Sequence, residues 1–283
     1  MNADNVSDAN ENEAVEPMDQ AAAKGTDERG PLEIAVAGGT GTLGRHVVEE
    51  LRARGHRVRV LSRRSAEYPV DLSTGEGLAA ALAGCDVVVD AANSTSPRTM
   101  RATLVDGTRR LLDAERAAGV GHHVCVSIVG CDRVPMPYYK VKTDQEGLVA
   151  AGRVPWTIVR ATQFHELAAS VFAASARARF LPASAGVPLQ PIAAAEAARA
   201  VADAAACAPR DGRIEVAGPD RTDLRSLAAT WRTGTGRRAV LLPVPLPGRL
   251  GRVLRAGHLT EAAPDVRGTT GFARWLAEQR RDA

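Results

Sequence analysis

A tyrosine and a lysine four residues apart, in the segment YYKVK at positions 138–142, could together handle a proton. Pro137 suits the first position of a helix, where side chains at i and i+4 share one face. A phenol has an ordinary pKa near ~10 and exchanges protons at neutral pH only when a neighbouring cation stabilises its anion. The spacing predicts that Lys142 is this cation for Tyr138. The alternative is a packed tyrosine beside an exposed lysine.

The rarity of lysine in this chain supports a functional role for Lys142. The sequence holds 33 arginines but only three lysines, at positions 24, 140 and 142. A compact ammonium fits beside a phenol and a ribose where a planar guanidinium does not. Ser127 ends an apolar run at 123–127, and the end of a parallel strand lies on the ligand-binding edge of an open α/β sheet. We therefore predict a catalytic group of Ser127, Tyr138 and Lys142.

A glycine-rich turn near the start of the chain predicts a phosphate-binding loop. Glycines at 38, 39, 41 and 44 follow the apolar run 34–37 and precede a helical pattern of Val47, Val48 and Leu51. Glycine allows a tight turn and a close backbone approach, and a helix N-terminus offers free N–H groups to an anion. Because strand, turn and helix follow in the order of a βαβ unit, we predict a dinucleotide site. An ordinary structural turn is the alternative.

The residues after the second predicted strand select the dinucleotide. Arg63 and Arg64 stand about twenty residues past the glycines, and no acidic residue occurs between Arg52 and Ala66. An NAD site usually places a carboxylate here, whereas guanidinium groups suit the 2′-phosphate of NADP. Arg45 could add positive charge beside the same phosphate. The sequence favours NADP(H), unless these are ordinary surface arginines.

The elements that must position these residues alternate regularly along the chain. Apolar runs predict strands at 32–37, 57–61, 86–91, 123–128 and 156–160, and periodic patterns predict helices at 43–54, 75–83, 98–118 and 137–151. This alternation is typical of a doubly wound parallel sheet, so the expected fold class is α/β, of Rossmann type.

Composition limits the remaining possibilities. Residues 1–30 hold eight acidic and two basic side chains without apolar periodicity, which predicts a disordered acidic tail. The chain shows neither a signal peptide nor an apolar run long enough for a bilayer, so we expect a cytoplasmic protein without a membrane partner. Scattered arginines and few aromatic residues argue against nucleic acid. The four cysteines and the histidines lack metal-ligand spacing, and we predict no metal.

Together these motifs resemble the short-chain dehydrogenase/reductase superfamily, and within it the atypical NmrA-like group of NAD(P)-binding proteins. The resemblance spans nearly all of residues 31–283, and the segments 70–72, 86–93 and 155–164 also carry it. It implies a Rossmann domain at 31–160. It further implies a small C-terminal α/β cap within 161–283, together with closing elements packed on the same domain.

The resemblance assigns a role to each matching residue. Lys142 would bind the nicotinamide ribose and favour the phenolate of Tyr138, which exchanges the proton, while Ser127 orients a carbonyl oxygen. Arg63 and Arg64 would hold the 2′-phosphate, and Asp71 would lie near the adenine. The full set of implied cofactor-binding residues is Gly38, Thr40, Gly41, Thr42, Leu43, Gly44, Arg63, Arg64, Asp71, Ala91, Ala92, Asn93 and Lys142.

The implied function is an NADPH-dependent oxidoreductase that transfers a hydride to a small carbonyl, quinone or enone. Phe164, Phe172, Phe180 and Leu181 predict an apolar lining and hence a hydrophobic substrate. The alternative is a non-catalytic NADP(H) sensor that acts through a partner protein. An isomerase or epimerase, which retains tightly bound NAD, fits the arginines poorly. By family analogy, helices 98–118 and 137–151 would pair two copies into a homodimer.

Overall fold

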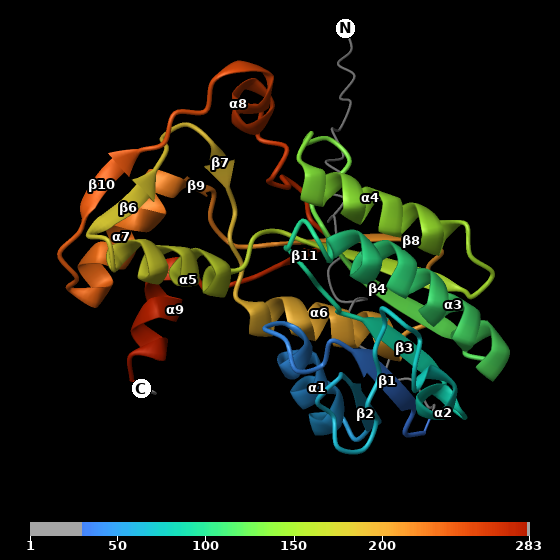
Figure 1. Cartoon of the computed structure of the whole chain (residues 1–283). Helices are drawn as coiled ribbons and strands as arrows, with labels where there is room; N and C mark the ends of the chain where they lie inside the picture. The colour runs from blue at the N-terminus through green and yellow to red at the C-terminus, as the bar shows by residue number, and fades with distance from the viewer. Residues whose placement is uncertain (1–29, 282–283) are drawn as a thin grey trace, which may run out of the picture.

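Seven parallel strands form one central sheet in the order β11-β8-β5-β4-β3-β1-β2 (Figure 1). The computed structural model describes residues 30–281, so nearly all of the predicted acidic tail lies outside the described residues. The strands of this sheet are β1 (Glu33–Ala37), β2 (Arg57–Leu61), β3 (Val87–Asp90), β4 (His122–Ile128), β5 (Trp156–Ala161), β8 (Gly212–Ala217) and β11 (Val266–Arg267). The predicted doubly wound α/β fold is confirmed.

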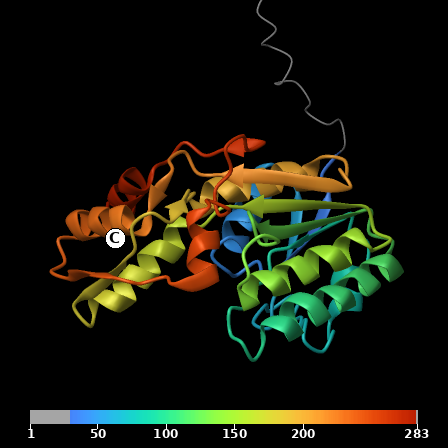
Figure 2. The same cartoon turned by 90° about the horizontal axis from the view of Figure 1, so that it is seen from above.

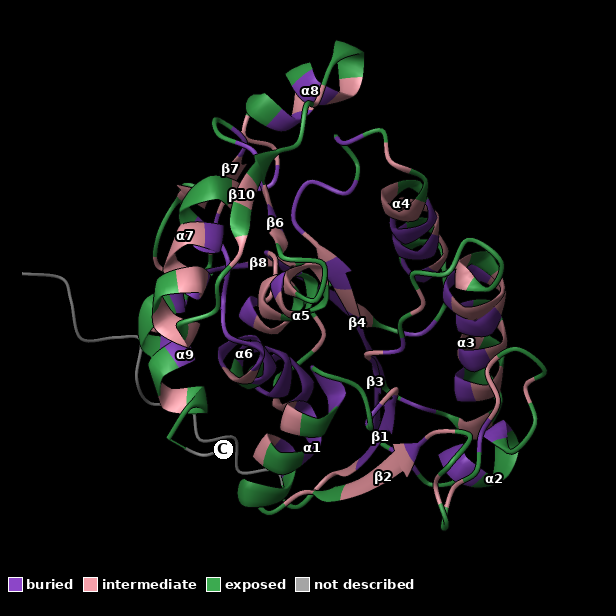
Figure 3. Ribbon diagram, turned by 60° about the vertical axis from the view of Figure 1, so that its left-hand side comes forward, coloured by how far each residue is buried: buried purple, intermediate pink, exposed green. Residues whose placement is uncertain are grey.

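Helices cover both faces of the sheet, which explains why its central strands are apolar on both sides. One face carries α1 and α6, and the other carries α2, α3 and α4, as Figures 2 and 3 show. These helices are α1 (Gly44–Ala53), α2 (Leu78–Leu82), α3 (Gly107–Ala118), α4 (Pro137–Ala150) and α6 (Ala194–Ala206). Within residues 30–281, no helix is long and apolar enough to span a membrane.

The connections on either side of β1 run in opposite directions. From β1 the chain passes through α1 to β2 on one side, whereas β3 lies on the other side of β1. The loops after β1 and β3 therefore separate at the carboxyl edge of the sheet, where open α/β sheets bind their ligands. This crevice places the glycine loop, after β1, opposite residues 91–93, after β3.

Two helices differ from their predicted bounds for local reasons. The helix predicted over 75–83 begins only at Leu78, because Gly77 has a left-handed φ of 82° and cannot continue a helix backwards. The helix predicted over 98–118 is divided into a π-helical turn, Ala102–Asp106, and the regular α3. Both changes lie outside the segments that carry the predicted catalytic group.

The C-terminal part of the chain builds a smaller lobe with its own core. Its elements are α5 (His165–Ala176), β6 (Phe180–Ala183), β7 (Pro188–Leu189), β9 (Thr222–Asp223), α7 (Leu224–Thr235), β10 (Val240–Pro243), α8 (Gly248–Arg255) and α9 (Phe272–Gln279). Phe172 and Leu181 are fully buried in this core, beside Trp231 and Trp275. The prediction that Phe172 and Leu181 line a substrate pocket is therefore wrong, since their apolar surface holds the lobe together.

A buried ion pair links α3 to the central sheet. His123 on β4 and Glu115 on α3 are both fully buried, and the imidazole Nδ1 lies 2.8 Å from a Glu115 oxygen. Burial disfavours the charged imidazole, but the Glu115 carboxylate outweighs burial and raises the pKa of His123 well above its ordinary value. Burial also raises the pKa of Glu115, so the ion pair exists between the raised pKa of Glu115 and the higher pKa of His123, and it is lost as the pH rises through the latter.

Glu115→Gln is expected to lower the free energy of unfolding by about 3–5 kcal/mol at pH 6, because it leaves a buried imidazole without its counter-charge. The loss should be smaller at pH 9, where the imidazole tends towards its neutral form. Urea unfolding at the two pH values measures both. Asp113→Asn, an exposed change on the same helix, should leave stability within about 0.5 kcal/mol. An equal effect of the two variants would contradict this assignment.

Candidate cofactor and catalytic site

The glycine loop fits tightly against the loop after β3. Gly38 has a φ of 73°, and a Cβ added there would lie 2.7 Å from the Cα of Ala92. A Cβ on Gly44 would lie 2.2 Å from the Gly38 carbonyl oxygen, and that oxygen accepts a 2.9 Å hydrogen bond from Gly41 N–H. Glycine at these positions is therefore required by the close approach of two backbones.

The loop presents an uncapped helix end to the crevice. Thr40, Gly41 and Thr42 are exposed, whereas Leu43 is buried in the core and anchors the start of α1. Leu43 gives α1 no side-chain cap, and the first turn of α1 contains no acidic residue. Free N–H groups and the positive end of a helix dipole suit a phosphate group. The loop therefore fits the pyrophosphate of a dinucleotide.

A buried polar network fixes the opposite loop. Asp90, the last residue of β3, is 1 % exposed, and one of its oxygens accepts from Ala92 N–H at 3.1 Å. The other oxygen accepts from the Thr108 hydroxyl at 2.9 Å and from the Gln145 amide at 3.0 Å. Asp90 thus connects the loop after β3 to two helices, α3 and α4.

Lys142 belongs to the same network. Its side chain is buried, and Nζ donates to the Val126 carbonyl at 2.7 Å and to the Gln145 amide oxygen at 2.6 Å. Gln145 therefore joins Lys142 to Asp90 through its two ends. The arrangement holds the ammonium beside β4 in a fixed position.

Tyr138 lies at the start of α4 and reaches across to the loop after β3. Its hydroxyl donates to the Asn93 side-chain oxygen at 2.8 Å. The neighbouring Tyr139 instead packs among apolar residues with Val134 and Leu254, and burial raises the pKa of Tyr139 to about 12. Of the two adjacent tyrosines, Tyr138 is the one whose phenol reaches the crevice.

Ser127 makes a different contact from the one its predicted role needs. Its hydroxyl donates to Glu146 at 2.5 Å, and both residues are buried. Glu146 also accepts two hydrogen bonds from the Arg160 guanidinium, at 2.9 and 2.7 Å. Burial disfavours the Glu146 carboxylate, yet Arg160 and Ser127 outweigh it and lower the pKa of Glu146. The structure thus connects Ser127 to an ion pair, whereas Tyr138 is bonded to Asn93.

The predicted 2′-phosphate residues lie in the loop after β2. Arg63 and Arg64 are exposed there, and the positive charge of Arg63 is felt at Asp71. Asp71 accepts hydrogen bonds from the N–H and the hydroxyl of Ser73, at 2.8 and 2.6 Å. These bonds, followed by Arg63, lower the pKa of Asp71. Asp71 thereby stabilises a turn next to the arginines.

Comparison with known proteins agrees with this geometry. The model of a family described as NAD(P)H-binding matches residues 38–206, from the first glycine of the loop to the end of α6. This match covers more than half of the chain. The chain belongs to the NAD(P)H-binding family. The predicted family and dinucleotide cofactor are thereby confirmed.

Curated relatives of this NAD(P)H-binding protein carry names of different functions. Photosystem II assembly factor Ycf39 of Cyanophora paradoxa is 30% identical over 149 residues, which cover 48% of this chain and 46% of the relative. The chain therefore spans about half the length of that protein. Ceramide reductase of Caulobacter vibrioides is 28% identical over 262 residues, covering 84% of this chain and 79% of the relative.

Solved structures of other proteins share the fold of this NAD(P)H-binding protein. The NADPH-dependent quinone oxidoreductase of Escherichia coli, complexed with NADPH, has a TM-score of 0.72 at 20% identity and covers 87% of this chain and 99% of its own. A Thermus thermophilus UDP-glucose 4-epimerase with NAD has a TM-score of 0.70 at 20% identity, covering 89% and 100%. Both likenesses establish the Rossmann architecture of the NAD(P)H-binding protein.

Sequence reasoning missed Gln145 and Glu146, which follow the predicted Lys142 on α4. One available signal was spacing, because Tyr138, Lys142 and Glu146 recur every four residues and so share a helix face. All of Lys142, Gln145 and Glu146 are buried, which is unusual for polar residues unless they are paired. Their partners on β3, β4 and β5 could not be read from spacing.

Proposed function

We propose that this protein is an NADPH-dependent oxidoreductase that transfers a hydride to a small, hydrophobic carbonyl, quinone or enone. The observation that carries the proposal is the position of Tyr138. Its hydroxyl bonds to Asn93 in the loop that also packs against Gly38. A phenol is thereby held at the edge of the crevice where open α/β sheets bind their ligands, and this position supports a role as the proton donor.

The proposal assigns the contacts of NADP(H) to residues of three loops and of α4. Gly38, Gly41 and Gly44 would receive the pyrophosphate, with Thr40, Thr42 and Leu43 completing the turn. Ala91, Ala92 and Asn93 would line the opposite side. Arg63 and Arg64 would hold the 2′-phosphate, with Asp71 near the adenine. The two guanidinium groups would discriminate NADPH from NADH, because only NADPH carries the extra dianionic group.

Replacing Arg63 and Arg64 together with alanine is expected to weaken NADPH binding by about 10–100-fold and to leave NADH binding within about twofold. Hydrogen bonds to charged groups contribute about 1.5–3 kcal/mol, which corresponds to this range. Titration of each nucleotide by fluorescence measures both constants. Arg116→Ala, an exposed arginine at the far end of α3, is the control. Equal losses for both nucleotides would refute a 2′-phosphate contact.

The proposed mechanism assigns the proton to Tyr138. A bound reduced nicotinamide supplies the hydride. Tyr138 donates its phenolic proton to the substrate oxygen, which replaces the Asn93 oxygen as the acceptor. Lys142, whose ammonium is held by Val126 and Gln145 one helical turn after Tyr138, would stabilise the phenolate that remains and would bind the nicotinamide ribose. Ser127 gives its hydroxyl proton to the buried Glu146 carboxylate and so cannot also donate to a substrate carbonyl oxygen, and the mechanism gives it no direct contact with the substrate.

The surroundings of Tyr138 support an apolar substrate. The ring of Tyr139 lies 5.9 Å from that of Tyr138 and joins an apolar cluster with Met136, Val187 and Leu254. This cluster connects the segment before α4 to α8 of the C-terminal lobe. The names of a relative, ceramide reductase, and of a protein with the same fold, quinone oxidoreductase, are compatible with this substrate class.

A non-catalytic NADP(H) sensor is the second candidate, favoured by one observation. The Ser127 hydroxyl and the Lys142 ammonium both have buried protein acceptors. NADPH oxidation against a panel of quinones, enones and aldehydes separates the two functions. Turnover supports the oxidoreductase. Tight NADPH binding without turnover of any panel member supports the sensor, and absence of NADPH binding would overturn both.

A further inference from the structure

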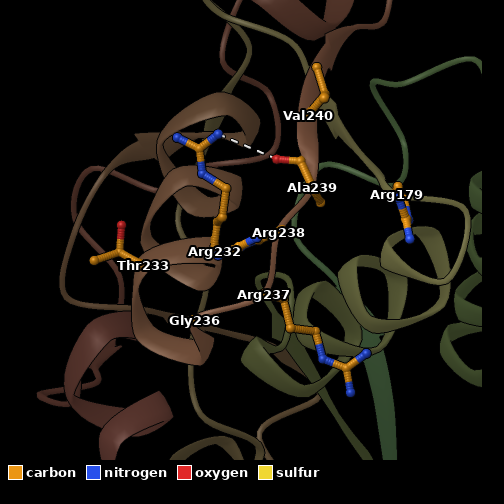
Figure 4. A pocket seen from close by; sticks show the side chains of 8 residues that line it. All are labelled: Arg179, Arg232, Thr233, Gly236, Arg237, Arg238, Ala239 and Val240. Carbon is orange, nitrogen blue, oxygen red and sulfur yellow. Dashed lines mark hydrogen bonds between the residues drawn. The ribbon is translucent and has the colours of Figure 1, made fainter.

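Four arginines surround a pocket on the C-terminal lobe, away from the glycine loop. The pocket has a volume of about 590 Å³ and is lined by Arg179, Arg232, Thr233, Gly236, Arg237, Arg238, Ala239 and Val240. Figure 4 shows that the arginines come from two sides. Arg179 follows α5, and the other three belong to the end of α7 and the segment before β10. No acidic residue lines the pocket.

The charges of these arginines are not balanced by neighbouring carboxylates. Among residues 30–281, no ion pair within 4 Å involves Arg179, Arg232, Arg237 or Arg238. By contrast, Arg54, Arg160 and Arg274 each pair with an acid. Arg232 donates a long 3.4 Å hydrogen bond to the Ala239 carbonyl, which keeps its guanidinium at the wall of the pocket. An anion in this pocket would therefore meet cationic side chains and no acidic one.

The backbone conformation of Arg179 also supports a ligand site. Arg179 has a φ of 59°, in the left-handed region where glycine is relaxed and a side chain costs about 1 kcal/mol. The next residues, β6, pair with β10, and Val240 N–H donates to the Arg179 carbonyl at 3.0 Å. That pairing fixes Arg179 opposite the arginines of the other side. Strain of this kind is often found at ligand sites.

An apolar strand borders the arginines. Val240, Leu242 and Val244 are 63 %, 46 % and 41 % exposed, and Val240 itself lines the pocket. Guanidinium groups bind phosphate through paired, charge-assisted hydrogen bonds. A volume of 590 Å³ lies within the range of small-molecule sites. We propose that this pocket binds a phosphate-bearing amphiphile, with the phosphate on the four arginines and the apolar body along β10.

The experiment uses the full chain and measures binding by tryptophan fluorescence, because Trp231 precedes Arg232 on α7. Its two probes are hexyl phosphate and vesicles of phosphatidylcholine with phosphatidylglycerol. The variants are Arg237→Ala with Arg238→Ala, and Arg179→Gly, which removes a guanidinium while relaxing the backbone. Arg116→Ala is the matched control. Circular dichroism and NADPH binding verify that each variant is folded.

Saturable hexyl phosphate binding that weakens at least tenfold in both pocket variants, and not in the control, supports the site with a free ligand as its source. Binding to anionic vesicles alone, lost in the same variants and absent with pure phosphatidylcholine, supports a lipid headgroup as the source. Binding to neither probe overturns the proposal. Equal binding by the pocket variants and the control also overturns it, because the four arginines would then contribute nothing specific.

Discussion

Tyr138→Phe is expected to lower kcat with an active quinone, enone or aldehyde by about 100-fold or more, while NADPH affinity stays within about twofold. The substitution removes one hydroxyl, and general acid catalysis contributes roughly 10²–10⁴ in rate. The lost hydrogen bond to Asn93 is partly exposed, so the free energy of unfolding should change by no more than about 1.5 kcal/mol. Steady-state kinetics and NADPH titration of the two proteins give both quantities.

Tyr139→Phe makes the same chemical change one residue away. Tyr139 is packed against the C-terminal lobe, and its pKa of about 12 keeps its phenol protonated. This variant should retain kcat within about threefold, since its hydroxyl plays no part in the proposed proton transfer. If Tyr139→Phe loses as much activity as Tyr138→Phe, the two adjacent rings act through packing, and the proton must be assigned elsewhere.

The features predictable from sequence are those that local chemistry determines. Glycine at 38 and 44 reflects backbone contacts within a few residues and with one neighbouring loop, and only glycine satisfies them. Apolar runs such as Ile34–Ala37 identify strands covered on both faces. The spacing of Tyr138 and Lys142 is a property of a single helix. Each of these features can therefore be recognised in the sequence without knowledge of the tertiary structure.

The partners of buried polar residues could not be predicted in the same way. Ser127 was expected beside Tyr138, but its hydroxyl is bonded to Glu146, which is paired with Arg160. That contact forms only if α4 packs on β4 and β5 in the register that brings Glu146 next to Ser127 and Arg160. Similarly, Phe172 was predicted to line the substrate site because the family resemblance places it in the C-terminal cap. Only the closed C-terminal lobe shows that the ring fills its core. Polar pairing and small-lobe packing depend on distances between elements, which spacing does not contain.

Gly44→Ala is expected to weaken NADPH binding by on the order of 100-fold, because a displaced turn would lose charge-assisted N–H bonds to the pyrophosphate that contribute about 1.5–3 kcal/mol each. A methyl group would lie 2.2 Å from the Gly38 carbonyl oxygen and 2.8 Å from the Gly39 Cα. Neither backbone can move without opening the turn. Overpacking of this kind also costs about 1–3 kcal/mol of stability, so thermal unfolding must accompany the NADPH titration.

Alanine variants of two further glycines distinguish damage to the phosphate-binding turn from loss of the fold. At Gly41, which is exposed, an added Cβ lies 3.2 Å from the Gly38 oxygen, so Gly41→Ala should weaken NADPH binding less than Gly44→Ala and leave the fold intact. At Gly147, inside α4, a Cβ meets no atom within 4 Å, and alanine should stabilise the helix by about 0.5–1 kcal/mol without changing NADPH affinity. A loss of NADPH affinity that increases from Gly147→Ala through Gly41→Ala to Gly44→Ala would match the increasing steric contact of the added methyl group with the Gly38 carbonyl. Unchanged NADPH affinity in a folded Gly44→Ala protein would instead mean that the dinucleotide does not depend on this turn.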